Sequence, residues 1–320
     1  MPLAVCMEIA RELQEISIDL SRGCCVTIGN FDGVHNGHRK LIRRTMEKAA
    51  KLGLPSVVVT FCPHPLKVLA GAHAAPLITD YEKKLDLFEA LGVDLVLMLE
   101  FTKALAGMEP EQFVREVLVE GLHMKELVVG YDYSFGKGRK GNFELLSELG
   151  ARFGYSTERL DPVIIDGAIV SSTRIRDMIK AGRVWYVRPL MDRFYVVRGI
   201  VVHGMDRGGK LLGFPTANMR VRDELHPMPG VYATWAEVDG KVYKAVTNIG
   251  TNPTFGNDEI SVETFIMDFD QDIYGWELRL NFVTRLRDEK KFGSLDELVA
   301  QITKDISLAR QILETPEAQL

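Results

Sequence analysis

The sequence predicts an α/β doubly wound parallel sheet followed by a small antiparallel β-barrel domain with a C-terminal helix. Three observations support this prediction. The chain has 320 residues, about twice the usual size of one domain, although one large domain is the alternative. Apolar runs alternate with helical segments up to about residue 180, and short alternating segments follow from about residue 187. We therefore expect one domain over residues 1–186 and a second over residues 187–320.

The first half contains four short apolar runs of the kind that form strands buried on both faces. They are "CVTIG" at 25–29, "SVVVTF" at 56–61, "DLVLML" at 94–99 and "ELVVG" at 126–130. Three segments between these runs, at 38–53, 81–92 and 109–122, carry apolar residues at helical spacing, and several end in glycine as helix C-caps do. This order predicts a ligand crevice beyond the carboxyl ends of the strands.

The second half predicts antiparallel strands closed by one helix. Asp239 and Gly240 separate two alternating runs and are typical of a hairpin turn. The helix is expected over residues 294–313, because Ser294 and Glu297 form the pattern of a capping box. A β-sandwich is the alternative to a barrel for these antiparallel strands. The domain seam lies near residues 183–194, where Pro189 interrupts a helical pattern.

Composition and charge disfavour several classes of protein. The chain is 46% hydrophobic and 26% charged with a formal net charge of −5, which argues against a general nucleic-acid binder, because that function requires a basic face. No apolar run approaches the roughly 18–20 residues of a membrane span. The four cysteines, all in the first fifth of the chain and without CxxC spacing, favour a reducing cytoplasm and disfavour zinc. The sequence leaves the oligomeric state undetermined.

The stretch "GNFDGVHNGH" at 29–38 lies where a predicted strand gives way to a helix. Its glycines allow sharp turns and close approach to a ligand, and the start of the following helix attracts anions. His35 and His38 would present imidazole donors on one helix face. The alternatives are a histidine-bearing turn without chemistry and a metal pair, although no nearby third ligand cluster completes a zinc site.

Two further polar runs suggest phosphate or metal chemistry. Ser171, Ser172 and Thr173 precede a predicted helix, where hydroxyl and N–H groups bind anions or simply cap the helix. In "GFPTANM" at 213–219, Thr216 and Asn218 are two apart in extended chain and project oxygens to one side, as Mg²⁺ prefers. The alternative for this second run is a polar turn between barrel strands.

The motifs together resemble those of the bacterial bifunctional riboflavin kinase/FMN adenylyltransferases, also called FAD synthetases, over nearly the whole chain. "GNFDGVHNGH" is similar to their HxGH nucleotidyltransferase signature. "VTFCPHP" at 59–65, "VGYDYSFGKGRKG" at 129–141 and "VSSTRIR" at 170–176 follow in the family's order. "GFPTANM" resembles the PTAN motif of riboflavin kinases, and "NIGTNPTFG" at 248–256 and "SVETFIMDF" at 261–269 follow it.

The resemblance implies the residues of an adenylyltransferase site in the first domain. His35 and His38 would bind the phosphates of ATP and stabilise developing charge, and Arg176 would hold the leaving phosphates. The other ATP-binding residues implied are Gly29, Asn30, Phe31, Ser171, Ser172 and Thr173. The residues implied for flavin are His64, Asp132 and Phe135, and the alternative for His64, between two prolines, is loop geometry.

The resemblance also implies a kinase site in the second domain. Thr216 and Asn218 would bind Mg²⁺, and Glu263 would be the catalytic base, although a strand glutamate usually just faces solvent. Gly208, Gly209 and Lys210 would cradle ATP phosphates in a glycine-rich loop. Two departures from the family pattern affect this site. The stretch before GFPTAN is one residue longer than usual, with Lys210 where arginine is common, and Phe265 replaces a frequent histidine.

The implied function is phosphorylation of riboflavin to FMN and adenylylation of FMN to FAD, with ATP as co-substrate and Mg²⁺ as cofactor. Riboflavin, FMN and ATP would be its partners, FMN and FAD its products, and the cytoplasm its location. A flavin-binding module that has lost turnover is a different class of function. A third possibility is an HxGH transferase that acts on another phosphorylated substrate, which the kinase motifs disfavour.

Overall fold

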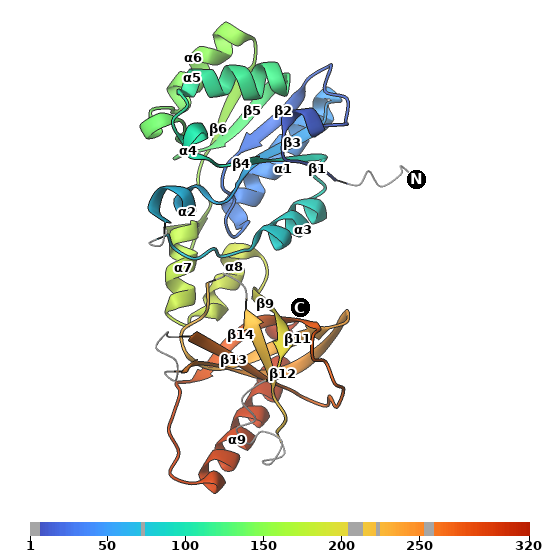
Figure 1. Ribbon diagram of the computed structural model, residues 1–320, viewed down its shortest axis with the longest axis vertical. Coiled ribbons are helices and arrows are strands. Elements are labelled where there is room, and N and C mark those ends of the chain that lie inside the picture. The colour runs from blue at the N-terminus through green and yellow to red at the C-terminus, as the bar shows by residue number, and fades with distance from the viewer. Residues whose placement is uncertain (1–6, 72–73, 204–213, 222–224, 253–258) are drawn as a thin grey trace. The chain divides into compact units, whose positions relative to one another are not determined.

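The computed structural model describes residues 7–71, 74–203, 214–221, 225–252 and 259–320. The chain divides into two compact units, Met1–Ser172 and Thr173–Leu320 (Figure 1). The second unit begins before the first barrel strand because the preceding helical segment packs within this unit. The amide of Met228 donates a hydrogen bond to the carbonyl of Ile179 in that segment at 3.3 Å. The functional boundary expected after residue 186 stays a prediction. No helix within the described ranges is long and apolar enough to cross a membrane.

A six-stranded sheet forms the first unit, in the order β1-β4-β3-β2-β5-β6, and every pair in it is parallel. The strands are β1 (Glu8–Ala10), β2 (Cys24–Ile28), β3 (Ser56–Cys62), β4 (Leu95–Glu100), β5 (Met124–Gly130) and β6 (Ser156–Leu160). The four predicted strands are confirmed, and β1 and β6 are additional. The chain continues from β2 to β3 on one side and returns to β5 on the other side of β2, so the strand order reverses at β2. In open sheets of this kind the ligand crevice is expected beyond the carboxyl ends of the strands at such a point.

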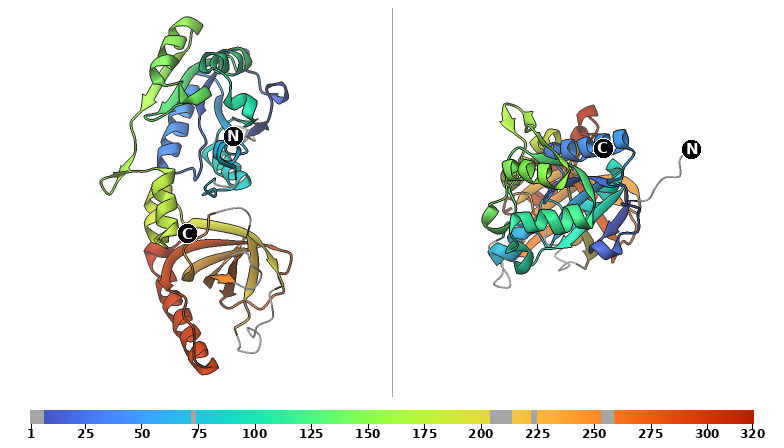
Figure 2. Two further views of the ribbon diagram at one scale, coloured as in Figure 1. Left: turned by 60° about the vertical axis from the view of Figure 1, so that its left-hand side comes forward. Right: turned by 90° about the horizontal axis from the view of Figure 1, so that it is seen from above.

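Helices cover both faces of this sheet (Figure 2). On one face lie α1 (Asn36–Leu52) and α3 (Tyr81–Leu91), whose Ile42 and Phe88 pack in one buried cluster. The opposite cluster takes Phe113 and Leu118 from α5 (Pro110–Phe113) and the π-helix η3 (Val114–Gly121), with α6 (Phe143–Phe153) beside them. The single helix expected over 109–122 is therefore an α-turn continued by a π-helix. Short elements complete the unit, namely η1 (Leu13–Glu15), α2 (Pro65–Ala70), α4 (Lys103–Ala106), η4 (Lys137–Arg139), β7 (Ile164–Ile165) and β8 (Ala168–Ile169).

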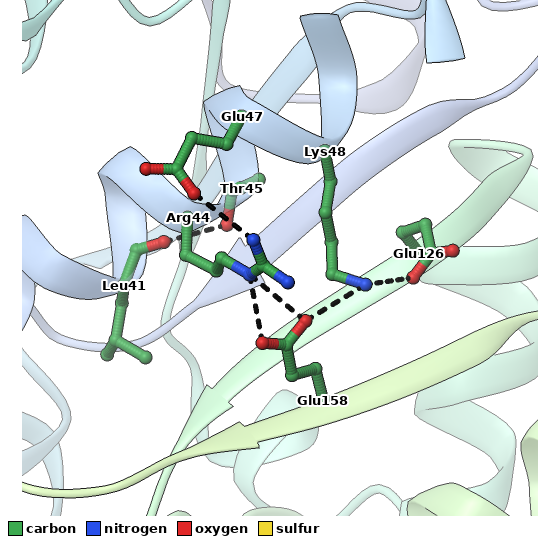
Figure 3. Close-up of polar contacts among 7 residues, drawn as sticks. All are labelled: Leu41, Arg44, Thr45, Glu47, Lys48, Glu126 and Glu158. Atoms are coloured by element: carbon green, nitrogen blue, oxygen red, sulfur yellow. Dashed lines mark hydrogen bonds and ion pairs between the residues drawn. The ribbon is translucent and has the colours of Figure 1, made fainter. Parts of the chain in front are cut away.

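An ion-pair network fixes α1 on the sheet (Figure 3). Glu158 of β6 accepts from Arg44 Nε at 2.9 Å and lies 3.0 Å from Lys48 Nζ, which also contacts Glu126 of β5 at 2.9 Å. Partial burial acts to raise the pKa of Glu158, but the hydrogen bonds from Arg44 and Lys48 outweigh it and hold that pKa below its usual value. The network therefore sets the position of the helix whose N-terminus carries the histidine pair.

The second unit contains a closed antiparallel barrel in the order β10-β13-β12-β11-β14-β9, which confirms the barrel over the sandwich. The strands are β9 (Tyr195–Val202), β10 (Ala217–Val221), β11 (Gly230–Val238), β12 (Lys241–Asn252), β13 (Glu259–Ile266) and β14 (Glu277–Arg287). Asp239 and Gly240 form the expected hairpin turn with φ of 48° and 70°. The buried hydroxyls of Thr234, Thr247 and Thr264 link three strands at 2.9 and 3.0 Å.

Helices flank the barrel in this unit. The C-terminal helix α9 (Leu295–Leu313) begins after Ser294, whose hydroxyl accepts from the Glu297 amide at 3.2 Å. It packs on the barrel through Ala309 and Leu313, and its buried Asp305 forms an ion pair with Arg287 of β14 at 2.8 Å. The remaining helices are α7 (Ser172–Lys180), η5 (Val184–Val187), α8 (Arg188–Met191) and η7 (Pro316–Ala318).

Candidate functional sites

The loop after β2 adopts an uncommon backbone conformation. Phe31, Gly33 and Val34 have φ of 49°, 88° and 37°, a region that side chains and above all β-branched ones disfavour. Each such non-glycine residue costs about 1–3 kcal/mol and persists only where its surroundings fix it. The turn is closed by the Val34 amide, which donates to the Phe31 carbonyl at 3.1 Å. This loop delivers the chain from the end of β2 to the N-terminus of α1.

The histidine pair lies at that N-terminus. His35 is the N-cap of α1, and its Nδ1 accepts from the His38 amide at 3.4 Å. The two imidazole rings stack with centroids 3.6 Å apart and planes 17° apart. A side chain at Gly37 would place its Cβ 3.1 Å from the His35 ring, so any larger residue would press on the stack and displace the ring by a few tenths of an ångström. The predicted sharing of one helix face is therefore realised as direct ring contact.

Aromatic packing supports the imidazole ring of His38. Phe31 is buried and contacts the His38 ring edge to face, with centroids 5.3 Å apart, and contacts Phe88 of α3 in the same way at 5.7 Å. Gly29 and Asn30 of the same loop are more exposed than Phe31. Phe31, expected to line the nucleotide site, thus also orients one imidazole.

The loop is anchored by two segments that are distant in the sequence. The buried carboxylate of Asp32 accepts from the amides of Ile78 at 3.0 Å and Thr79 at 3.2 Å. The Asp32 carbonyl accepts from the hydroxyl of Ser172 at 2.9 Å. The Ser172 hydroxyl therefore contacts the histidine loop, although Ser172 and Asp32 are 140 residues apart in the sequence.

The other residues expected from this polar run are neighbours of Ser172 in the sequence. Helix α7 begins at Ser172, so Thr173 belongs to its first turn and Ser171 immediately precedes it. Arg176 lies one turn further along α7 and is partly buried. Residues four apart share a helix face, so Arg176 follows Ser172 on the same side of α7.

The three expected flavin residues occupy different settings. His64 is buried and caps α2, accepting from the Leu66 amide at 3.2 Å, and its own amide donates to the Tyr81 hydroxyl at 2.6 Å. Asp132 is exposed. Phe135 is partly buried and stacks on Tyr133 with centroids 5.5 Å apart. His64 follows β3 and the other two follow β5, so all three lie beyond the carboxyl end of a strand.

Strand register assembles the second candidate site on the barrel. Asn218 of β10 lies directly opposite Glu263 of β13, and Asn248 of β12 lies opposite Glu263 from the other side. Directly opposed residues have Cβ atoms about 4.5–5.5 Å apart and point to the same face of the sheet. Thr216 precedes Asn218 by two residues, the spacing that keeps side chains on one face in extended chain. All four residues are partly exposed.

The glycine-rich loop predicted for the kinase site and Phe265 differ in whether the structure describes them. Gly208, Gly209 and Lys210 lie outside the described residues. Phe265, which stands where the family often has histidine, packs against the cluster between the barrel and α9, with Phe214 at a centroid distance of 5.7 Å. Its position is thus explained by packing.

Comparisons with known proteins match both halves. A model described as FAD synthetase matches residues 17–174, and one described as riboflavin kinase matches residues 191–313. The bifunctional riboflavin kinase/FMN adenylyltransferase of Escherichia coli (strain K12) is 37% identical over 308 residues, covering 95% of this chain and 97% of that protein. The chain belongs to the bifunctional riboflavin kinase/FMN adenylyltransferase family. The Bacillus subtilis (strain 168) protein of the same name is 36% identical over 287 residues, covering 88% of this chain and 89% of that protein.

The fold of this family member also occurs among solved structures. A crystal structure of a Streptococcus pneumoniae protein named as a macrolide-efflux protein has a TM-score of 0.86 at 31% identity. The likeness covers 96% of this chain and 99% of that one. The name refers to that protein alone. The family assignment of this chain rests on the two family models and the sequence relatives.

The FAD synthetase match contains the histidine pair, and the riboflavin kinase match contains Asn218 and Glu263. Sequence reasoning missed three neighbours of these sites, Asp32, Lys84 and Asn248. Asp32 and Asn248 both stand inside quoted motifs, and those motifs were the available signal. Lys84 of α3, which donates to the Asn30 carbonyl at 3.1 Å, carried no signal of its own, because helix packing brings it to the site.

Proposed function

We propose that the two family activities reside in the two candidate sites, with adenylyl transfer at the histidine loop and phosphoryl transfer on the barrel face. The related proteins are named for both activities. The observation that supports this division is that the His35–His38 stack and the Asn218–Glu263 pair lie in different compact units. Riboflavin would be phosphorylated to FMN in the second unit, and FMN would be adenylylated to FAD at the first site.

In adenylyl transfer a phosphate oxygen of FMN attacks the α-phosphorus of ATP, and the bond to the bridging oxygen of pyrophosphate breaks. Negative charge grows on the phosphate oxygens, so positioned donors lower the barrier. His35, His38 and the first amides of α1 supply such donors at a positively polarised helix end. Stacked rings 3.6 Å apart disfavour two positive charges until a polyphosphate arrives.

The start of α7 completes the proposed ATP site. Ser172 ties α7 to the loop through the Asp32 carbonyl. Thr173 and Ser171 would offer hydroxyl groups beside it, and Arg176 would hold the leaving pyrophosphate through its fixed charge. Gly29, Asn30 and Phe31 would border the nucleotide. His64, Asp132 and Phe135 would contact the flavin, because they follow the carboxyl ends of β3 and β5, the two strands that flank β2 in the sheet.

In the kinase reaction the 5′-hydroxyl of riboflavin attacks the γ-phosphorus of ATP, the hydroxyl proton passes to a base and ADP leaves. Glu263 is the proposed base. Its flanking residues Asn218 and Asn248 place amide groups on the same face, where they orient the carboxylate and the phosphates. Gly208, Gly209 and Lys210 would cradle the phosphates.

The donor set on this face fits Mg²⁺. A threonine hydroxyl, an asparagine amide oxygen and a nearby carboxylate are hard oxygen ligands, and Mg²⁺ is usually held by few protein groups together with nucleotide phosphates. Thr216 and Asn218 are the proposed ligands. When bound, Mg²⁺ supplies positive charge that neutralises the transferring phosphates. Location in the cytoplasm stays a prediction.

Product analysis tests the proposed function. Purified protein is incubated with riboflavin and Mg-ATP, or with FMN and Mg-ATP, and the flavins are separated by chromatography. We expect FMN and then FAD from riboflavin, with pyrophosphate released only in the second step. A protein that bound flavin but formed neither product would be a binding module, and FAD formed from FMN alone would leave only the N-terminal activity.

A further inference from the structure

A buried lysine lies beneath the histidine loop. Lys84 of α3 is only 3% exposed, which is rare for lysine. Its Nζ donates to the carbonyl of Asn30 at 3.1 Å and lies 5.1 Å from the centroid of the Tyr81 ring. Asn30 is the residue that immediately precedes the left-handed turn at Phe31. Lys84 therefore holds the loop at the point where it leaves the end of β2.

The charge of Lys84 matters because the buried carboxylate of Asp32 interacts with it electrostatically. Asp32 is 3% exposed and points toward the chain at Ile78 and Thr79. An uncompensated negative charge under the N-terminus of α1 would repel the phosphates that the site must receive. The Lys84 ammonium offsets that charge and also makes a charge-assisted hydrogen bond, which is stronger than a neutral one.

We propose that Lys84 is a positioning residue for adenylyl transfer, whose ammonium fixes the Asn30 carbonyl and offsets Asp32 so that the histidine loop accepts the phosphates of ATP. This inference rests on the proposed function of the N-terminal site. Lys84 touches neither substrate nor the reacting atoms in this role. It acts through the loop backbone and through the field beneath α1.

The protonation of Lys84 is accessible to experiment. Burial lowers its pKa to about 8, while Asp32 and then Cys62 oppose that shift. The groups that face it are Asp32 from the loop, Cys62 from β3 and Tyr81 from its own helix. Burial raises the pKa of Tyr81 to about 12, so the tyrosine stays neutral through the range in which Lys84 loses its proton.

The test measures FAD formation from FMN and ATP as a function of pH, since kcat/KM reports groups of the free enzyme. In the wild type, kcat/KM for ATP should fall as the pH rises above about 8. Lys84→Arg should lack this fall up to about pH 9.5, because a guanidinium keeps its charge. Lys84→Met should lower kcat/KM by about 10- to 100-fold at pH 7, the range typical of supporting residues around a site. Lys51→Met, which removes an exposed lysine from α1, is the charge-matched control and should behave as the wild type.

Thermal unfolding followed by circular dichroism reports whether the first unit of each variant is folded, and FMN formation from riboflavin by the same preparations reports the integrity of the second unit. A Lys84→Met protein with wild-type kcat/KM for FAD formation would overturn the inference, and so would a Lys84→Arg profile that falls at the same pH as the wild type. If the first unit of Lys84→Met proves to be misfolded, the pH profile of Lys84→Arg decides the test alone. A wild-type protein that makes no FAD would overturn the proposed function, and this inference with it.

Discussion

The imidazole rings of His35 and His38 stack 3.6 Å apart across the first turn of α1. The contact depends on the glycine between them and on the capping bond from the His38 amide to His35 Nδ1. Two donors are thereby held side by side at the positive end of a helix that ion pairs fix to the sheet. The arrangement suits a phosphate chain better than either histidine would alone.

Replacing His38 with alanine removes one donor without removing the cap. We expect His38→Ala to lower kcat for FAD formation by about 10²- to 10³-fold, the usual effect of deleting a charge-stabilising donor. FMN formation should stay at the wild-type rate, because Glu263 lies in the other compact unit. Separate assays from FMN and from riboflavin measure the two rates. Loss of both activities in a folded protein would contradict separate sites.

Gly37→Ala tests the stacked geometry. Alanine favours a helix over glycine by up to about 1 kcal/mol, but its Cβ would lie 3.1 Å from the His35 ring. We therefore expect a melting temperature that is unchanged or raised together with a marked loss of FAD formation. Circular dichroism and the adenylylation assay measure these two effects. Wild-type FAD formation by this variant would show that ring position is unimportant.

Glu263→Gln keeps the shape of the side chain and removes the proposed base. FMN formation should fall by about 10²-fold or more, while FAD formation from supplied FMN should continue. Asn248→Ala should lower FMN formation less, because it removes a neighbour of the carboxylate. Initial rates of FMN formation with riboflavin and Mg-ATP measure the loss in each of the two variants. Full kinase activity in Glu263→Gln would remove the glutamate from its role.

The network around Glu158 predicts a pH-dependent contribution to stability. Its pKa is lowered in the folded chain, so its contribution is present above the unfolded value of about 4.5 and is lost as the pH falls through the folded pKa. Glu158→Gln should destabilise by about 0.5–1 kcal/mol at pH 7, since the pair is partly exposed. Glu47→Gln, which affects a more exposed partner of Arg44, should change stability less.

Thermal unfolding monitored by circular dichroism measures this difference. The gap between the wild type and Glu158→Gln should narrow as the pH falls below about 4 and should shrink in 1 M salt. A gap that is constant from pH 7 to pH 3 would mean that shape, and not charge, accounts for the effect of the substitution.

Much of the secondary structure could be predicted from local pattern. Apolar runs marked β2, β3, β4 and β5, and the Asp239-Gly240 turn and the Ser294 cap were placed correctly. Strand β1 was missed because it has three residues, and β6 because "STERL" at 156–160 lacks an apolar run. Edge strands need little burial, so their sequences carry a weak signal. Helix η3 was expected as ordinary α-helix, since periodicity does not separate the two.

The candidate sites, like the secondary structure, were only partly predictable from local sequence. Glycines, histidines and the strand-to-helix junction at 29–38 were sufficient to predict a histidine-bearing turn at a helix N-terminus, because those properties act within one turn of chain. Anion binding there and the family roles of the individual residues stay proposals. The contacts of Asp32, Lys84 and Asn248 could not be predicted, because each reaches its site through a partner far away in the sequence.

By itself, then, the amino-acid sequence determined the two-part organisation, most helices and strands, and the position of the histidine-bearing turn at the start of a helix. Only the tertiary structure decided that Ser172 meets the Asp32 carbonyl, that Lys84 lies under Asn30, and that Asn218 and Asn248 flank Glu263. The reason is physical. Propensity and periodicity act between neighbours, whereas register and packing are settled by the burial of the whole core.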